Sequence, residues 1–183
     1  MQAEQRERRA LLVVDMLNDF VADKGVLTAG KPAQDIIPFV AAKAREVAAE
    51  GGRVYFLTDN HSPDDPEFGV FPPHCVRGTW GADIVPELEA VRQELGPRAE
   101  RVLKTRYSGF HGTDLADRLQ RDGITQTEVV GVATNICVLY NVEELWNRGY
   151  RPVVYREGVA TFDPPAHDFA LNQMASVLGA VVK

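Results

Sequence analysis

The alternation of short apolar runs with longer amphipathic runs constrains the fold of this chain more than any other feature. Residues 10–16 and 53–59 are apolar runs without a helical period, which is typical of buried strands. Between them, residues 36–50 carry apolar side chains at helical spacing, and the pattern stops at Gly51 and Gly52. A strand, a helix and a second strand are therefore predicted in that order.

The same alternation continues to the end of the chain. Further helices are predicted at residues 85–95, 112–123, 135–148 and 164–178, and further strands at residues 100–105, 127–133, 151–158 and 180–183. The segment from residue 60 to about residue 83 has no regular pattern. We predict a three-layer αβα fold of the α/β class, with a six-stranded, mostly parallel sheet in Rossmann-like order and helices on both faces. Residues 1–183 are expected to form one domain, because the length suits a single core.

Composition and charge narrow the classes of partner. A hydrophobic content of 45% and a charged content of 25% are those of an ordinary globular protein. The net charge of -6 argues against nucleic acid and anionic membranes as partners. Asp15 interrupts the first apolar run, which is too short for a signal peptide. We expect a cytoplasmic protein that acts on a small molecule, with its two cysteines reduced.

Four chemically capable side chains follow predicted strands. They are Asp15, Asp59, Lys104 and Cys137. Ligands of open parallel sheets bind outside the carboxyl ends of the strands, so these groups are predicted to meet at one edge. Each alone has an ordinary explanation as a turn former, a solvated lysine or a core cysteine, but the combination favours a site.

Cys137 is the candidate nucleophile. Asn135 is a good helix N-cap, which would place Cys137 in the first turn, where the helix dipole and Lys104 would favour a thiolate. Asp15 could accept the thiol proton and return it to a leaving group. Cys75, on a loop stiffened by prolines, has no predicted helix start beside it and is interpreted as a bystander thiol.

Four carboxylate and imidazole side chains that suit a divalent transition metal fall between residues 59 and 74: Asp59, His61, Glu67 and His74. By spacing alone, Asp64 or Asp65 could replace Glu67 as a ligand. A solvated acidic turn with two surface histidines is also compatible with this spacing. The two other histidines, His111 and His167, are expected on the surface.

Several segments together resemble the isochorismatase-like cysteine hydrolases, and within them the nicotinamidases (pyrazinamidases). The matching segments are "LLVVDMLNDF", "LTDNH", "PPHCVRGT", "KTRYSGFHGTDL" and "GVATNICV". They occur in the family's order from Leu11 to about Ala160, and "TDNH" followed by "PPHC" marks the nicotinamidase branch more specifically than the other segments do.

The resemblance implies a catalytic triad of Asp15, Lys104 and Cys137. It also implies a cis peptide bond between Val132 and Ala133, and an oxyanion hole formed by the N–H groups of Ala133 and Cys137.

The resemblance assigns Asp59, His61, Glu67 and His74 to one divalent transition metal ion, which would be zinc, iron or manganese and would bind a pyridine nitrogen. Phe20 and Phe71 match positions that flank the substrate, and Tyr107 would line the entrance. The family commonly has Trp at the position of Phe71 and Asp at the position of Asn135, and both departures bear on the substrate. The resemblance also implies a homo-oligomer.

The implied function is hydrolysis of nicotinamide to nicotinate and ammonia through a cysteine thioester, a step of NAD salvage. A related cysteine hydrolase acting on another small amide or a vinyl ether is the first alternative. A non-catalytic module that binds a metabolite is the second.

Overall fold

The computed structural model describes residues 7–183 and has a six-stranded sheet at its centre. The strands lie in the order β3-β2-β1-β4-β5-β6, and every neighbouring pair is parallel. The predicted fold class is confirmed, including the Rossmann-like order. The strands are β1 (Arg9–Val14), β2 (Arg53–Asp59), β3 (Ala99–Lys104), β4 (Gln126–Val132), β5 (Val153–Ala160) and β6 (Val181–Val182).

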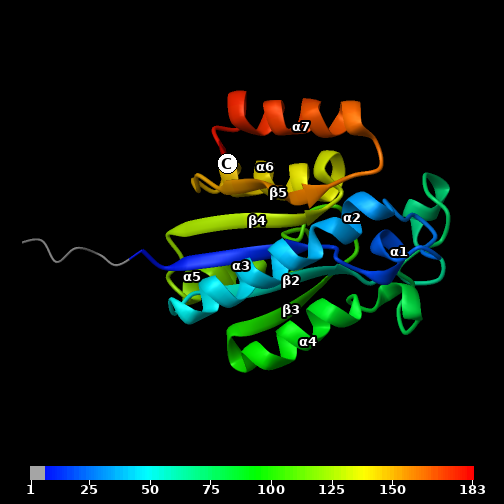
Figure 1. Ribbon diagram of the computed structural model, residues 1–183, viewed down its shortest axis with the longest axis horizontal. Helices are drawn as coiled ribbons and strands as arrows, with labels where there is room; N and C mark the ends of the chain where they lie inside the picture. Colours follow the sequence, from blue (N-terminus) through cyan, green and yellow to red (C-terminus); the bar gives the residue numbers. More distant parts are fainter. Residues whose placement is uncertain (1–6) are drawn as a thin grey trace, which may run out of the picture.

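Helices cover both faces of the sheet, with α3 and α4 on the near side in Figure 1. The α-helices are α1 (Asn18–Val21), α2 (Lys31–Asp35), α3 (Ile37–Ala49), α4 (Pro86–Leu95), α5 (Leu115–Arg121), α6 (Leu139–Asn147) and α7 (Pro164–Ser176). Short 3-10 helices occupy Pro66–Gly69, Trp80–Ala82 and Gly96–Arg98. None of the helices among residues 7–183 is long and apolar enough to cross a membrane.

Alternate residues of β1 point into two separate cores. Leu11 and Val13 pack with the apolar face of α3, while Leu12 and Val14 pack with α5, α6 and α7. All four side chains are buried, because a central parallel strand is covered on both faces. This explains why β1 is a continuous apolar run in the sequence.

The predicted elements correspond to observed ones, with differences at their ends. The strand predicted at residues 151–158 starts and ends two residues later, as β5. The helix predicted at residues 135–148 is divided into a π-helical turn, Thr134–Val138, and α6. Helices α1 and α2 were not predicted, because each has five residues or fewer and shows no clear amphipathic period.

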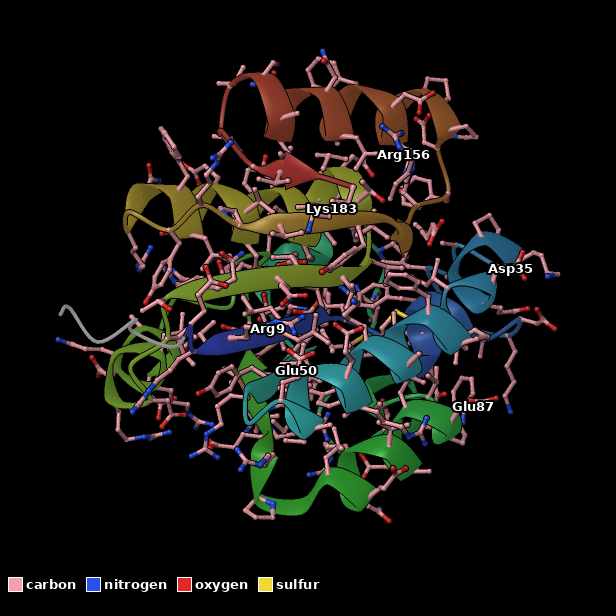
Figure 2. The ribbon with its side chains drawn as sticks, turned by 60° about the vertical axis from the view of Figure 1, so that its left-hand side comes forward. Arg9, Asp35, Glu50, Glu87, Arg156 and Lys183 are labelled. Carbon is pink, nitrogen blue, oxygen red and sulfur yellow. The ribbon has the colours of Figure 1, made fainter. Side chains whose placement is uncertain are left out.

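The two edges of the sheet differ in character. At the amino-terminal edge, Arg9 forms ion pairs with Glu46, Glu50 and Glu128, and Figure 2 shows Arg9 beside Glu50. The strands run from this edge toward the end of the molecule where α1 and α2 lie (Figure 1). The side chains that could take part in catalysis or metal binding lie at this carboxyl-terminal edge.

Candidate active site

Asp15 lies one residue beyond β1 in a left-handed backbone conformation, with φ of 48°. This conformation is uncommon for residues other than glycine and turns the chain away from the strand. The Asp15 Oδ1 atom accepts a hydrogen bond of 3.0 Å from the backbone N–H of Asp59. The carboxylate is therefore fixed against the end of the neighbouring strand, and it is 1% exposed.

Lys104 is the centre of a buried charge cluster. Its Nζ atom lies 2.7 Å from Asp15 Oδ2, forms an ion pair with Asp59 Oδ1 and lies 3.8 Å from Cys137 Sγ. Asp15 Oδ2 has no well-aligned hydrogen bond, so its contact with Lys104 is mainly ionic. All four predicted strand-end groups thus come together within one buried cluster.

Cys137 lies on the π-helical turn that follows β4. Ala133 is the N-cap of this turn and makes no side-chain cap, so the prediction of Asn135 as N-cap is wrong. The Asn135 side chain instead accepts a hydrogen bond from Thr161 Oγ1 at 2.7 Å. The peptide bond between Val132 and Ala133 is cis, as the resemblance implies. Among residues 7–183, the Ala133 N–H donates to no backbone carbonyl, so it is available to a ligand.

The charges of the cluster favour a neutral Cys137 thiol over a thiolate. Burial raises the pKa of Cys137 well above its ordinary value; Lys104 opposes this rise, and Asp15 and Asp59 add to it. Burial and the nearby Asp59 also raise the pKa of Asp15 to about 7, against the effect of Lys104. This balance argues against the predicted thiolate in the resting protein, because two carboxylates already face one ammonium group. A proton can instead pass from Cys137 to Asp15 without changing the net charge of the cluster.

Asn141 is a positioning residue that the sequence did not reveal. Its buried side chain donates to the backbone carbonyls of Cys137 at 2.7 Å and Tyr107 at 3.1 Å, and accepts from Gly109 N–H at 2.8 Å. It joins the helix that carries the thiol to the segment that follows Lys104. An asparagine in an amphipathic helix gives no signal of such a contact in the sequence.

The four predicted metal ligands also come together. Asp59, His61, Glu67 and His74 each offer a ligand atom, and all of these atoms lie within 4.8 Å of one another. His61 Nε2 lies 3.5 Å from Asp59 Oδ2, and His74 Nε2 lies 3.7 Å from Glu67 Oε1. Of the alternatives to Glu67, Asp64 is exposed, and Asp65 contacts His61 on its other nitrogen, Nδ1, at 3.1 Å.

The hydrogen bonds of the two imidazoles fit a metal site. His74 Nδ1 contacts the Pro72 carbonyl at 2.8 Å, and a carbonyl can only accept, so this nitrogen carries the proton. His61 Nδ1 likewise faces a carboxylate, that of Asp65. Both Nε2 atoms then face the same carboxylate-lined space, and the buried His61 Nε2 has no hydrogen-bond partner. A divalent cation in this space could bind one atom from each of the four side chains. Histidines whose other ring nitrogen is held in this way are typical metal ligands.

Cys75 follows a metal-ligand candidate but takes no part in the site. Its N–H donates to Asp19 Oδ2 at 2.7 Å, and its sulfur lies 3.7 Å from the Gly81 carbonyl. Burial raises the pKa of its thiol well above the ordinary value. The thiol is fully buried and packed in the core, as expected of a bystander.

A cavity of about 360 Å³ gives access to both halves of the site. Asp15, Cys137 and His74 lie in its wall. The remaining lining residues are Phe20, Val26, Leu27, Thr28, Ala29, Phe71, Tyr107, Val132, Ala133, Ile136 and Phe162. The lining thus includes the three aromatic residues predicted at the substrate and the predicted oxyanion donor Ala133.

Phe162 lines the cavity and was not among the predicted site residues. It follows β5, and the rule that strand ends meet at one edge would have included it. His167 is also more than a surface residue, because its Nδ1 contacts the buried Thr134 hydroxyl at 2.9 Å, on the turn that carries Cys137. His111 is exposed, as expected.

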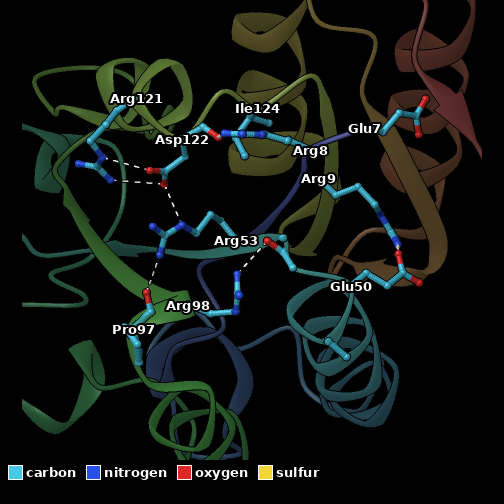
Figure 3. Close-up of a pocket in the computed structure, with 13 residues that line it drawn as sticks. Glu7, Arg8, Arg9, Glu50, Arg53, Pro97, Arg98, Arg121, Asp122 and Ile124 are labelled. Atoms are coloured by element: carbon cyan, nitrogen blue, oxygen red, sulfur yellow. Dashed lines mark hydrogen bonds and ion pairs between the residues drawn. The ribbon is translucent and has the colours of Figure 1, made fainter. Parts of the chain in front are cut away.

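A larger hollow of about 1470 Å³ opens at the opposite edge of the sheet, where several arginines gather (Figure 3). These arginines bind the protein itself. Arg53 contacts Asp122 and the Pro97 carbonyl, and Arg98 donates to the Gly51 carbonyl. Because these arginines are already paired with backbone carbonyls and a carboxylate, this hollow offers, among the described residues, no group of reactive side chains comparable to the cluster around Cys137.

Comparisons with known proteins agree with this architecture and site. Residues 9–183 match the Isochorismatase domain family. An isochorismatase family protein of Bacillus subtilis (strain 168) is 38% identical over 180 residues, which cover 96% of this chain and 98% of that protein.

Two solved structures are also similar. The pyrazinamidase/nicotinamidase of Streptococcus mutans UA159 has a TM-score of 0.91 at 38% identity, covering 96% of this chain and 99% of that one. The pyrazinamidase of Pyrococcus horikoshii in complex with zinc has a TM-score of 0.86 at 30% identity, covering 96% and 98%.

The family match covers nearly the whole described chain, and the TM-scores show that the structural neighbours have the same fold. Both solved structures are of proteins named as amidases, and one of them contains zinc. The chain belongs to the isochorismatase family of hydrolases.

Proposed function

We propose that this protein is a metal-dependent nicotinamidase, which hydrolyses nicotinamide to nicotinate and ammonia through a thioester on Cys137. One observation carries the proposal: Cys137, Asp15 and His74 lie in the wall of the same cavity. A molecule bound in this cavity would face the nucleophile, its base and one ligand of the four-donor metal group. The relatives named as pyrazinamidases and nicotinamidases support the same substrate class.

The first half-reaction forms the thioester. The Cys137 sulfur attacks the carboxamide carbon while its proton passes to Asp15. The N–H groups of Ala133 and Cys137 donate to the oxygen of the tetrahedral intermediate. Asp15 then gives the proton to the amide nitrogen, the C–N bond breaks and ammonia leaves. Lys104 stabilises the negative charge that moves between the sulfur and the two carboxylates.

The second half-reaction restores the enzyme. Asp15 accepts a proton from water, the resulting hydroxide attacks the thioester carbon, and the C–S bond breaks. The sulfur takes the proton back, and nicotinate is released. The sum is amide plus water giving acid plus ammonia.

Asp59, His61, Glu67 and His74 would hold the metal ion, and zinc suits the mixture of imidazole and carboxylate donors. A bound ion would supply an open coordination position for the pyridine nitrogen of the substrate. Burial lowers the pKa of His74, so its imidazole is neutral and able to act as a ligand.

The cavity walls favour an uncharged planar substrate. Among residues 7–183, no lysine or arginine lines this cavity, and Lys104 lies behind it in contact with Asp15 and Asp59. A small amide that carries its own carboxylate would lose hydration there without gaining a lysine or arginine partner. The apolar rings of Phe20, Phe71 and Phe162 instead suit an aromatic ring.

Ammonia release from nicotinamide and benzamide, before and after chelation of the metal, tests the proposal. Benzamide has the same shape but no ring nitrogen. We expect efficient use of nicotinamide, a sharp rise in its KM after chelation, and poor use of benzamide in both states. Equal use of both amides, unaffected by chelation, would place the protein in another branch of the family. No turnover, together with a thiol that resists alkylation, would favour a binding module.

A further inference from the structure

Asp65 is a buried carboxylate that has no role in the proposed hydrolysis and is not one of the four proposed metal ligands. It is 7% exposed and lies directly behind two of the proposed metal ligands. Its Oδ2 atom is 3.1 Å from Nδ1 of His61, and its Oδ1 atom accepts a 2.9 Å hydrogen bond from the backbone N–H of Glu67. One side chain therefore contacts the ring of one ligand and the peptide of another.

Arg106 holds Asp65 from the far side. Its Nη1 atom lies 3.0 Å from Asp65 Oδ1 and 3.3 Å from Oδ2. The backbone carbonyl of Arg106 accepts a hydrogen bond of 3.1 Å from Nζ of Lys104. The same residue thus contacts the proposed catalytic lysine through its backbone and the metal-ligand loop through its side chain.

We propose that Asp65 and Arg106 are positioning residues that set the affinity and geometry of the metal site. Asp65 keeps the proton of His61 on Nδ1, so that the Nε2 lone pair faces the other donors. It also caps the 3-10 helix Pro66–Gly69, on which Glu67 lies. Arg106 fixes the carboxylate in the one orientation that makes both contacts. This inference rests on the metal site of the proposed function.

Two neighbouring aspartates allow a matched test. Asp65→Asn keeps the shape of the side chain but leaves a single acceptor oxygen, so it can accept from His61 Nδ1–H or from Glu67 N–H but not from both. Asp64→Asn makes the same change of charge one residue away, at an exposed position. Arg106→Ala removes the ion pair while leaving Asp65 in place, and Arg106→Lys restores a cation there.

The zinc affinity of the full chain is measured by competition with a chromogenic chelator, and the absorption spectrum of the cobalt(II) form reports ligand geometry. Asp65→Asn is expected to bind zinc about 10- to 100-fold more weakly, the usual effect of removing an outer partner of a ligating histidine. Arg106→Ala should show a smaller loss, partly recovered in Arg106→Lys, and both Asp65→Asn and Arg106→Ala should alter the cobalt spectrum. Asp64→Asn should match the unmodified protein.

The outcomes separate this inference from the proposed function. If the unmodified chain binds no zinc, the metal site itself is wrong. If it binds zinc and Asp65→Asn retains the affinity and cobalt spectrum of Asp64→Asn, only the positioning role is overturned. Circular dichroism of the metal-free proteins detects a variant that fails to fold. In that case Arg106→Ala decides the question, and unchanged zinc affinity in that variant would overturn the inference.

Discussion

Asp59 and Lys104 are register partners at the ends of β2 and β3, and their side chains form a buried ion pair. The second carboxylate oxygen of Asp59 lies 3.5 Å from Nε2 of His61. One aspartate therefore contacts both the charge cluster around Cys137 and the four-donor group. A change at Asp59 should therefore affect both the chemistry at Cys137 and metal binding. Changes at the other proposed ligands should mainly affect metal binding.

Asp59→Asn is expected to lower kcat and to reduce zinc retention, because it removes one counterion of Lys104 and one donor of the metal site. His74→Ala should reduce zinc retention and raise KM for nicotinamide with a smaller effect on kcat, since His74 does not contact Lys104. Steady-state kinetics and metal content of both variants check this difference. Identical kinetic changes in the two variants would contradict the shared role of Asp59.

The two cysteines should respond differently to removal. Cys137→Ala is expected to abolish turnover with the fold intact, because it deletes the proposed nucleophile and trims only a small side chain. Cys75→Ala should retain most activity and cost about 1 kcal/mol of stability, since its sulfur is packed in the core. Ammonia release and thermal unfolding of both variants are the measurements. An active Cys137→Ala protein would show that the nucleophile is misassigned.

The pH dependence should reflect the raised pKa of Asp15. Its carboxyl group, with a pKa of about 7, becomes protonated as the pH falls through that value and can then no longer accept the thiol proton. We expect kcat/KM for nicotinamide to fall below about pH 7, although an ordinary aspartate would remain ionised to about pH 4. A profile of kcat/KM measured from about pH 5 upward decides between a raised and an ordinary pKa for Asp15, with circular dichroism as a control for folding. Activity that persists unchanged down to about pH 5 would contradict the raised pKa of Asp15, because an ordinary aspartate would still be ionised there.

Gly131 should tolerate no side chain. It has φ of 117° and is the register partner of Val14, and an added Cβ would lie 2.1 Å from the Val14 carbonyl oxygen. Gly131→Ala is expected to cost roughly 3 kcal/mol or more in the free energy of unfolding. Gly69→Ala is the control, because its Cβ would meet nothing within 4 Å and its φ is not positive. Chemical denaturation of both variants checks the difference, and equal stability would contradict it.

Much of the fold and the composition of the candidate site could be predicted from the sequence. The buried strands of a parallel sheet are continuous apolar runs, and the amphipathic period of α3 lies between two of them. The rule that strand ends share an edge grouped Asp15, Asp59 and Lys104. The choice of Glu67 over its neighbours depended on family resemblance, because loop geometry is not encoded in spacing.

Other features depended on three-dimensional contacts. The π-helical turn at Thr134–Val138 places Ala133, and not Asn135, at the start of the helix, although N-cap preferences favour asparagine over alanine. The state of the Cys137 thiol follows from the balance of two carboxylates against one ammonium group in a buried space. The roles of Asp65 and Asn141 follow from hydrogen bonds that connect distant segments, and residue type alone does not reveal them.

The order of the strands also has a consequence for how the protein acquires its activity. Because all the strands are parallel, no two sheet neighbours are joined by a tight hairpin. Asp15 and Asp59 are 44 residues apart, Asp59 and Lys104 are 45 apart, and Lys104 and Cys137 are 33 apart. Such contacts of high contact order form late in folding, after the entropy of closing long loops has been lost. During refolding, recovery of hydrolytic activity should therefore lag behind the recovery of helical circular dichroism, so that activity reports completed tertiary assembly.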